Sequence, residues 1–532
     1  MIKLRFGVLN SVARICRNLS CISFLCFVAT APAVTLVNSW IKSTSGPWQE
    51  LPSWSLGELP DAAQDVLITN ANWKAVEINA QTAQNFSDSM TVHSVRVSAP
   101  PDSFNTLLMN FAGFGRPLQT GGINIETNGA LTVQSSWLEV IINSGNGSAG
   151  NISVSGTVKQ GDFSWVTAQG SLTVSTFFGP GAYFFTNGLL RADMDERIGG
   201  PWPGRLVQYA GTNTTGSLVV STDGDLDLYG GQLTSANGLT VGLGDRATSA
   251  NFYQYGGNVN ANTIINGHYF LNGGKIIGNM LVAESGQRVD GSVVQTGGTN
   301  SAISMDLAHP NRFGGRAFYT LSNGVINVDT STTFRGGLFS QYAGRHTIVS
   351  NLNLHAADLG GFGFAHADYA LWGGTLSAGG LSVLASTFQQ NGGTNSIAGD
   401  IVLTGPFPQG FNVQSPQYNL TAGFLTATNV FVSPFFGGFR QSGGISQITS
   451  TLSLQGSNYD GSQYALEGGT LLVKDIVVSS NAFFQHTNGT IVQSGLLTLN
   501  EGGWRAANGD RSRCSQNRVE LLQRRSPSLA SR

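Results

Sequence analysis

The chain has 532 residues, of which 70 are glycine and only 11% are charged. A hydrophobic fraction of 41% is too high for a disordered chain, and the glycines lack the three-residue period of collagen. Between residues 18 and 504, 17 Lys and Arg stand against 28 Asp and Glu, a net charge of −11. This acidic body argues against a nucleic-acid partner, which needs a basic face.

Residues 1–33 have the features of a signal peptide. Four basic residues precede an apolar stretch at 19–29, and Ala31-Pro-Ala33 supplies a small-residue cleavage pattern. The stretch is short for a membrane span, although a membrane-anchored form of it is the alternative. We therefore expect an exported mature chain that begins near Val34 and contains no transmembrane segment.

Cysteine usage gives the exported body no disulfide framework. Cys16, Cys21 and Cys26 lie in the signal, and Cys514 lies in the C-terminal tail. We expect the stability of the body to come from its stacked strands.

Residues 34–120 do not carry the repeat described below, and we interpret them as an N-terminal β cap. An atypical terminal unit would cover the unpaired backbone at the end of a stack of strands. Tryptophan is enriched here, and we expect the rings to be buried, with carbohydrate binding as the sharper alternative. The four residues are Trp40, Trp48, Trp54 and Trp73.

From residue 121 to 503 the chain repeats the phrase aromatic-x-Leu/Gln-x-Gly-Gly. Copies of the Leu form start 43 to 50 residues apart, and copies of the Gln form follow them after about 20 residues. A period near 46 residues made of two turns near 23 predicts an all-β fold, a parallel β-helix or β-solenoid. The Leu copies start at Tyr183, Leu226, Tyr269, Tyr319, Tyr369, Tyr418 and Tyr464, and the clearer Gln copies at Phe252, Val293, Phe388 and Phe439, with weaker ones around Gln208, Gln341 and Gln485.

The glycine pair is expected to allow a positive φ or a bulge where the chain turns a corner. The aromatic residue and the Leu or Gln two positions later should share one face of a strand, and in the last copy we assign these positions to Phe483 and Gln485. Whether this face points inward stays open at this stage. If it does, every glutamine must be hydrogen-bonded internally.

Residues 504–532 form an Arg-rich tail with one glycine and no repeat phrase. Two interpretations remain, a disordered basic tail and the product of a shifted reading frame or truncated gene model.

Signals for chemistry are sparse, and we predict no catalytic, cofactor-binding or metal-binding residue and no cofactor. The seven histidines show no ligand-like spacing, and Gly242-Leu-Gly244 resembles a dinucleotide loop without the βαβ context. Asp223, Asp225 and Asp227 are the best calcium candidates, but their alignment with the phrase favours a solvated strand face. Asp193-Met-Asp-Glu196 is interpreted as a solvated loop.

The chain resembles a group of bacterial exported, Gly-rich repeat proteins related to autotransporter passengers. The resemblance covers roughly residues 34–500 and implies a surface-exposed solenoid, often followed by a C-terminal sorting signal, with little indication of chemistry. It rests on the repeated phrases together with Trp54-Ser-Leu-Gly-Glu-Leu-Pro60, Asp65-Val-Leu-Ile-Thr-Asn70 and Asn105-Thr-Leu-Leu-Met-Asn110.

The sequence therefore predicts an exported structural or adhesin-like β-solenoid of the bacterial surface or extracellular space, or of the periplasm, without catalytic activity. Its partner is unknown, with surface glycans or cell-envelope components as the fitting classes. The alternative is a carbohydrate-active β-helix, either a polysaccharide lyase or a glycosidase.

Overall fold

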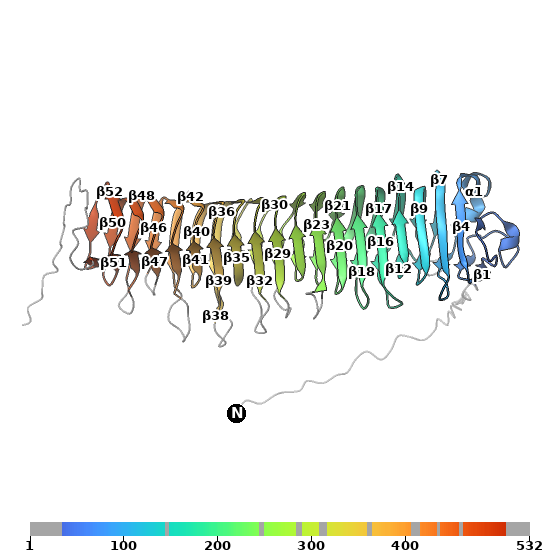
Figure 1. The fold of residues 1–532 in the computed structure, drawn as a ribbon, viewed down its shortest axis with the longest axis horizontal. Coiled ribbons are helices and arrows are strands. Elements are labelled where there is room, and N and C mark those ends of the chain that lie inside the picture. The colour runs from blue at the N-terminus through green and yellow to red at the C-terminus, as the bar shows by residue number, and fades with distance from the viewer. Residues whose placement is uncertain are drawn as a thin grey trace, which may run out of the picture. The chain divides into compact units, whose positions relative to one another are not determined.

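The structure is a computed structural model that describes residues 35–143, 148–243, 249–283, 290–307, 316–358, 364–405, 415–433, 437–456 and 461–506. All of them belong to the unit that begins at Thr35. Their regular secondary structure is nearly all β, and they form a β-solenoid of about 18 turns, which confirms the predicted fold class (Figure 1). The proposed signal peptide and the four cysteines lie outside the described residues.

Each turn contributes one strand to each of three parallel ladders. The first ladder holds the strands of the repeated phrase: β2 (Gly46–Pro47), β4 (Trp73–Asn79), β7 (Phe104–Thr120), β9 (Gly129–Val140), β13 (Thr157–Gln160), β16 (Gly181–Phe185), β18 (Gly204–Gln208), β20 (Gly224–Leu228), β23 (Asn251–Gln254), β26 (His268–Leu271), β29 (Gly291–Gln295), β32 (Ala317–Leu321), β35 (Gly337–Gln341), β39 (Ala367–Leu371), β41 (Thr387–Gln390), β44 (Gln417–Leu420), β47 (Gly438–Gln441), β49 (Gln463–Leu466), β51 (Phe483–His486) and β54 (Gly503–Ala506).

The second ladder follows the glycine corner. It contains the later parts of β7 and β9, and otherwise β5 (Thr91–Val92), β14 (Ser164–Ala168), β17 (Gly188–Ile198), β19 (Thr212–Val220), β21 (Gln232–Ser235), β24 (Asn258–Asn260), β27 (Lys275–Ile277), β30 (Thr299–Ala302), β33 (Val325–Val328), β36 (Arg345–His355), β40 (Thr375–Leu384), β42 (Thr394–Ile397), β45 (Phe424–Ala427), β48 (Ile445–Leu454), β50 (Thr470–Val478) and β52 (Thr490–Gln493).

The third ladder completes each turn, and the long strands β17, β19, β36, β40, β48 and β50 bend into it from the second ladder. Its other members are β1 (Leu36–Ser39), β3 (Gln64–Ile68), β6 (Ser94–Val97), β8 (Gly122–Ile125), β12 (Asn151–Val154), β15 (Leu172–Val174), β22 (Leu239–Val241), β25 (Thr263–Ile265), β28 (Met280–Val282), β31 (Met305–Leu307), β34 (Thr332–Phe334), β43 (Asp400–Thr404), β46 (Asn429–Val432) and β53 (Leu497–Leu499).

A few short elements lie outside the ladders. The helices are η1 (Leu51–Ser53), α1 (Ala80–Asn85) and η2 (Ser87–Met90), and two antiparallel pairs are formed by β10 (Ile142–Asn143) with β11 (Ser148–Ala149) and by β37 (Ala357–Asp358) with β38 (Phe364–Ala365).

The Trp-rich region 34–120 combines a packed tryptophan cluster with the first turns of the solenoid. Trp40, Trp48 and Trp54 are at most 1% exposed and meet edge to face, and the indole nitrogen of Trp54 donates a 2.8 Å hydrogen bond to the carbonyl oxygen of Trp48. Trp73 differs from the expectation of burial, because it is 73% exposed, although its ring contacts Phe104 and its indole nitrogen donates a 3.2 Å hydrogen bond to the carbonyl oxygen of Asp102. The parallel ladders already run through this region, from β1 to β3 and β6.

The shared face of the phrase points inward. Its rings stack from turn to turn with neighbouring centroids 4.3 to 5.2 Å apart and fill the solenoid, and all of them are buried except Trp504, which is partly buried. The longest continuous series is Tyr319, Phe339, Tyr369, Phe388, Tyr418, Phe439, Tyr464, Phe484 and Trp504.

The last copy of the phrase is shifted by one residue from its predicted position. Tyr464 pairs with Phe484 and Leu466 pairs with His486, so Phe483 and Gln485 lie on the outward face. The assignment to Phe483 and Gln485 was wrong. In each copy the inward Leu or Gln position lies three residues before the corner glycine, which is Gly489 here, so His486 occupies that position. The first ladder then continues to Ala506, and residues 507–532 lie outside the described residues.

Buried glutamines join successive turns, as an inward face requires. The side-chain nitrogen of Gln341 donates to the carbonyl oxygen of Gly344 at 3.2 Å and to that of Thr375, on the following turn, at 3.0 Å. Its side-chain oxygen accepts a 2.6 Å bond from the hydroxyl of Tyr369, also on the following turn. The same Tyr–Gln pairing occurs in Tyr183–Gln160, Tyr269–Gln254, Tyr319–Gln295, Tyr418–Gln390 and Tyr464–Gln441.

The glycine corner has one fixed geometry. Three residues separate each phrase strand from the next strand from β18 onward, and the third of them is a glycine with positive φ. At Gly374 φ is +75°, and a Cβ there would lie 2.4 Å from the carbonyl oxygen of Gly344 on the preceding turn. Glycine is therefore required both for the dihedral angle and for the close stacking of corners.

Candidate functional site

Strands β35, β39 and β41 lie side by side in the first ladder (Figure 1). Over these three strands the outward face of the ladder is hollowed. The groove has a volume of about 540 Å³. Its lining residues are Leu338, Ser340, Tyr342, Asp368, Tyr369, Ala370, Trp372, Thr387, Gln389 and Asn391.

Small side chains create the groove. In the middle outward position of these strands, Ser340 pairs with Ala370, which in turn pairs with Gln389. The same position is filled by stacked rings further back along the ladder, where Tyr253 and Phe270 lie 4.8 Å apart. The groove is therefore a local property of three turns.

Two half-exposed rings form one side of the groove. Tyr342 is 53% and Trp372 is 51% exposed, and their ring planes are parallel within 7° with centroids 6.2 Å apart. On the next turn the corresponding residue is Asn391, whose side-chain oxygen accepts bonds of 2.9 Å from Gln389 and from Thr421. This side thus presents aromatic surface next to amide groups.

A carboxyl group lies on the opposite side. Asp368 pairs with Leu338 and Thr387 in the ladder. Burial raises the pKa of Asp368, against the influence of nearby His366 and of hydrogen bonds from Thr387. Its Oδ1 is buried and has no hydrogen-bond partner among the described residues. The groove thus combines an aromatic side, a polar side and a floor of small residues.

A second exposed aromatic stack lies on earlier turns of the same ladder. Tyr209, Tyr229 and Tyr255 are 44 to 49% exposed and stack with centroids 5.3 and 4.7 Å apart. The adjacent middle position is occupied by Tyr253, so this stack borders a filled surface.

The three aspartates considered for calcium do not converge. Asp223 lies in a turn, Asp225 accepts a 2.9 Å bond from Asn251, and Asp227 forms an ion pair with Arg205 at 2.6 Å. Asp225 and Asp227 share the outward strand face, as predicted, but Asp227 is only 4% exposed. Among the described residues, no group of three or more His, Cys, Asp and Glu could hold a metal ion.

Glu196 contradicts the prediction of a solvated loop at 193–196. A register shift between Ala192 and Asp195 turns its side chain inward, between Leu172 and Leu218 of the third ladder. It is fully buried, and Asn213 donates to its oxygens at 3.1 and 3.3 Å. Burial raises the pKa of Glu196 to about 7, against the effect of the bonds from Asn213. Asp193 is exposed and pairs with Arg191.

Sequence reasoning missed a histidine–carboxylate pair. Asp65 accepts hydrogen bonds from His93 at 2.6 Å and from Ser94 at 2.5 Å. The register of β3 and β6, which pairs Asp65 with Ser94, brings these residues together. The serine contacts the carboxylate rather than the histidine, so the arrangement is not a nucleophile–base pair.

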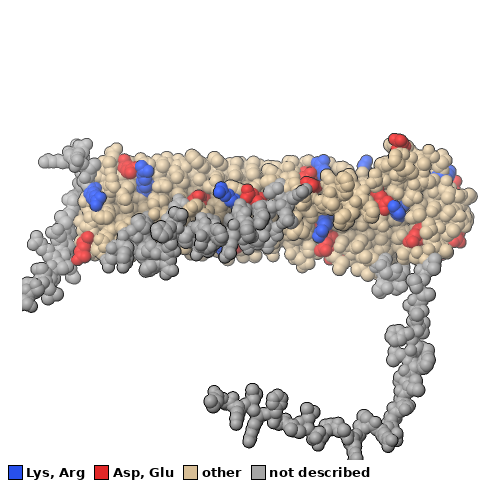
Figure 2. Space-filling model, turned by 90° about the horizontal axis from the view of Figure 1, so that it is seen from below, with Lys and Arg blue, Asp and Glu red and all other residues tan. Residues whose placement is uncertain are grey.

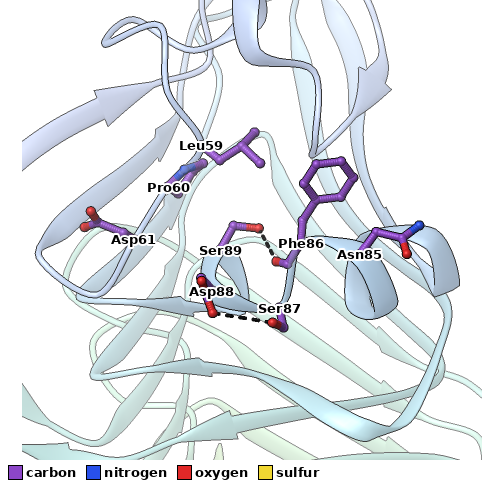
Figure 3. A pocket seen from close by; sticks show the side chains of 8 residues that line it. All are labelled: Leu59, Pro60, Asp61, Asn85, Phe86, Ser87, Asp88 and Ser89. Atoms are coloured by element: carbon purple, nitrogen blue, oxygen red, sulfur yellow. Dashed lines mark hydrogen bonds between the residues drawn. The ribbon is translucent and has the colours of Figure 1, made fainter.

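A smaller hollow of about 260 Å³ lies in the N-terminal region (Figure 3). Its lining comes from the loop at Leu59, Pro60 and Asp61 and from residues 85–89. Asp61 accepts a hydrogen bond from the backbone nitrogen of Ala63, and Asp88 accepts one from Ser87. These carboxylates stabilise their own turns.

On the face shown in Figure 2, acidic and basic side chains are scattered among uncharged ones. No helix within the described ranges is long and apolar enough to cross a membrane. Of the dinucleotide-like segment at 242–247, residues 244–247 lie outside the described residues.

Comparison of the chain with protein-family models, with curated proteins and with solved structures found no match.

Proposed function

We propose that the chain is an exported structural or adhesive β-solenoid of the bacterial surface or extracellular space, which acts by binding. The observation that carries this proposal is the groove over β35, β39 and β41, where half-exposed rings and polar groups lie on a rigid, repetitive face. Apolar surface with a few placed polar groups is typical of a ligand site. The resemblance to exported repeat proteins and the signal-like residues 1–33 support the location.

The groove supports binding better than hydrolysis. Glycoside hydrolysis generally uses two carboxyl groups that flank the scissile bond. Asp368 is the one carboxyl group among the lining residues, and it is partly buried beside Thr387.

The location is tested by fractionating the producing bacterium and sequencing the N-terminus of the protein. We expect cleavage near Val34 and recovery of the protein from the medium or from a protease-accessible surface fraction. An uncleaved cytoplasmic protein would contradict the proposal.

The rival carbohydrate-active enzyme is tested with the same purified protein on a panel of neutral and acidic polysaccharides. We expect no release of reducing ends or unsaturated products above the blank. Turnover that disappears in Asp368→Asn would establish the enzyme instead, whereas equal turnover in that variant would indicate a contaminant.

A further inference from the structure

We infer that the groove over β35, β39 and β41 binds an uncharged hexose oligosaccharide that lies along the direction in which the turns follow one another. This inference names the ligand class of the adhesive function proposed above and rests on that function.

The aromatic side matches the apolar faces of sugar rings. Tyr342 and Trp372 occupy equivalent positions on adjacent turns, and their parallel rings are each about half exposed. The next turn carries the smaller Asn391, so the stack of rings ends at Trp372. A pyranose ring, which has C–H groups on its faces, can pack against the apolar surface that these two rings leave exposed.

The polar groups match the hydroxyls at the edge of the same sugar. Gln389 and Asn391 offer amide groups on the turn that follows Trp372, and Asp368 offers a carboxyl group across the groove. A bound sugar buries its hydroxyls, which then need partners in the site.

The direction follows from the strand spacing. Adjacent turns are separated by ~4.8 Å, which is close to the length of one pyranose ring. Ser340 and Ala370 leave the floor of two successive turns open. Consecutive sugars can therefore contact consecutive turns. On the earlier strands β23 and β26 the same middle outward position is filled by the rings of Tyr253 and Phe270.

The lining favours an uncharged sugar. Asp368 is the one acidic residue in it, and no lysine, arginine or histidine is among the ten lining residues. The carboxylates of a uronic acid chain would meet Asp368 with no lysine, arginine or histidine in the lining to balance them.

The test uses the full exported chain and measures the affinity for cellohexaose, maltohexaose, mannohexaose and hexagalacturonate. We expect binding of at least one neutral hexaose and weaker binding of hexagalacturonate. Ala370→Phe should weaken the neutral ligand at least about tenfold, because it fills the floor with a ring that the ladder already accommodates at Phe270.

Trp372→Ala should cause a comparable loss, whereas Tyr229→Ala, which removes a similarly exposed ring from the other stack, should leave the affinity unchanged. If Trp372→Ala fails to fold, Ala370→Phe decides alone. Binding of none of the neutral hexaoses, a preference for hexagalacturonate, or unchanged affinity in Ala370→Phe would overturn the inference.

The outcomes separate this inference from the proposed function. Loss of the sugar site with correct export and no turnover would leave the adhesive solenoid in place. Turnover or cytoplasmic location would remove the proposed function itself.

Discussion

Tyrosine and glutamine side chains on neighbouring turns satisfy one another inside the solenoid. A buried amide is costly unless its oxygen and nitrogen both find partners. Gln208 shows what happens when one partner is missing. Its nitrogen donates to the carbonyl oxygen of Gln232 at 3.0 Å, but its oxygen has no partner among the described residues. The reason is that Leu226 stands on the next turn where other copies of the phrase carry tyrosine.

Leu226→Tyr should therefore stabilise the protein. The new hydroxyl can donate to Gln208, as Tyr369 donates to Gln341, and the gain should be about 1 kcal/mol. The matched control is Leu226→Phe, which adds the ring without the hydroxyl. Chemical denaturation of both variants measures the difference, and a tyrosine variant no more stable than the phenylalanine variant would contradict the prediction.

Glu196 should make stability depend on pH. Its folded-state pKa of about 7 lies above the ordinary value of 4.5, so the native state holds a proton that the unfolded state releases between these values. The free energy of unfolding therefore falls as pH rises from about 4.5 to 7, by up to about 3 kcal/mol.

Glu196→Gln should remove this dependence, so that its stability relative to the unmodified protein is greater at pH 8 than at pH 5. The exposed Asp193→Asn serves as the control and should show no such trend. If the free energy of unfolding of Glu196→Gln differed from that of the unmodified protein by the same amount at pH 5 and at pH 8, Glu196 would not be the group responsible.

At the scale of one structural element, the two ends of a phrase strand behave differently. The glycine corner always contains three residues from β18 onward, whereas the connection from the third ladder back to the first varies in length. It holds two residues between β25 and β26 but twelve between β43 and β44. The constant corner keeps the turns in register, and the variable connection lets the number of residues per turn change.

Gly374→Ala should be strongly destabilising, by about 2–4 kcal/mol, because the alanine adopts a left-handed φ and overlaps the backbone of the preceding corner. Gly115→Ala is the matched control, since a Cβ at Gly115 meets nothing within 4 Å. The thermal midpoint should fall clearly in the first variant and change little in the second. Equal midpoints would show that the corner tolerates a side chain.

For the whole molecule, periodicity was sufficient to predict the fold but not the direction of its faces. Tyrosine is amphipathic and glutamine is polar, so the pattern alone could not show that Tyr369 and Gln341 point inward. Inside the solenoid the two side chains satisfy each other through a hydrogen bond between adjacent turns. The shift at Phe484 could have been found from the sequence, because Gly489 sets the phase of that copy. The burial of Glu196 could not have been found from the sequence, since a register shift inside its strand turns the side chain from the outward face to the inward face.

The groove was also beyond sequence reasoning. Ser340 and Ala370 are unremarkable separately, and they form a floor only because the pairing of β35 with β39 places them side by side. Trp372 belongs to one of the clearest copies of the phrase. The residue at its position differs from copy to copy, so the repeat pattern gave no indication of a site there. The bulk of neighbouring residues on three turns, rather than any motif, defines the site.

The alternation of glutamine and leucine along the first ladder limits how turns can be gained or lost in evolution. If the turn of Phe388 and Gln390 were deleted, Tyr418 would stack on the turn of Leu371 and its hydroxyl would lose its acceptor. Deletion of two consecutive turns would restore the match. Changes in length that keep every tyrosine next to its glutamine therefore add or remove even numbers of turns, so that the solenoid counts in pairs.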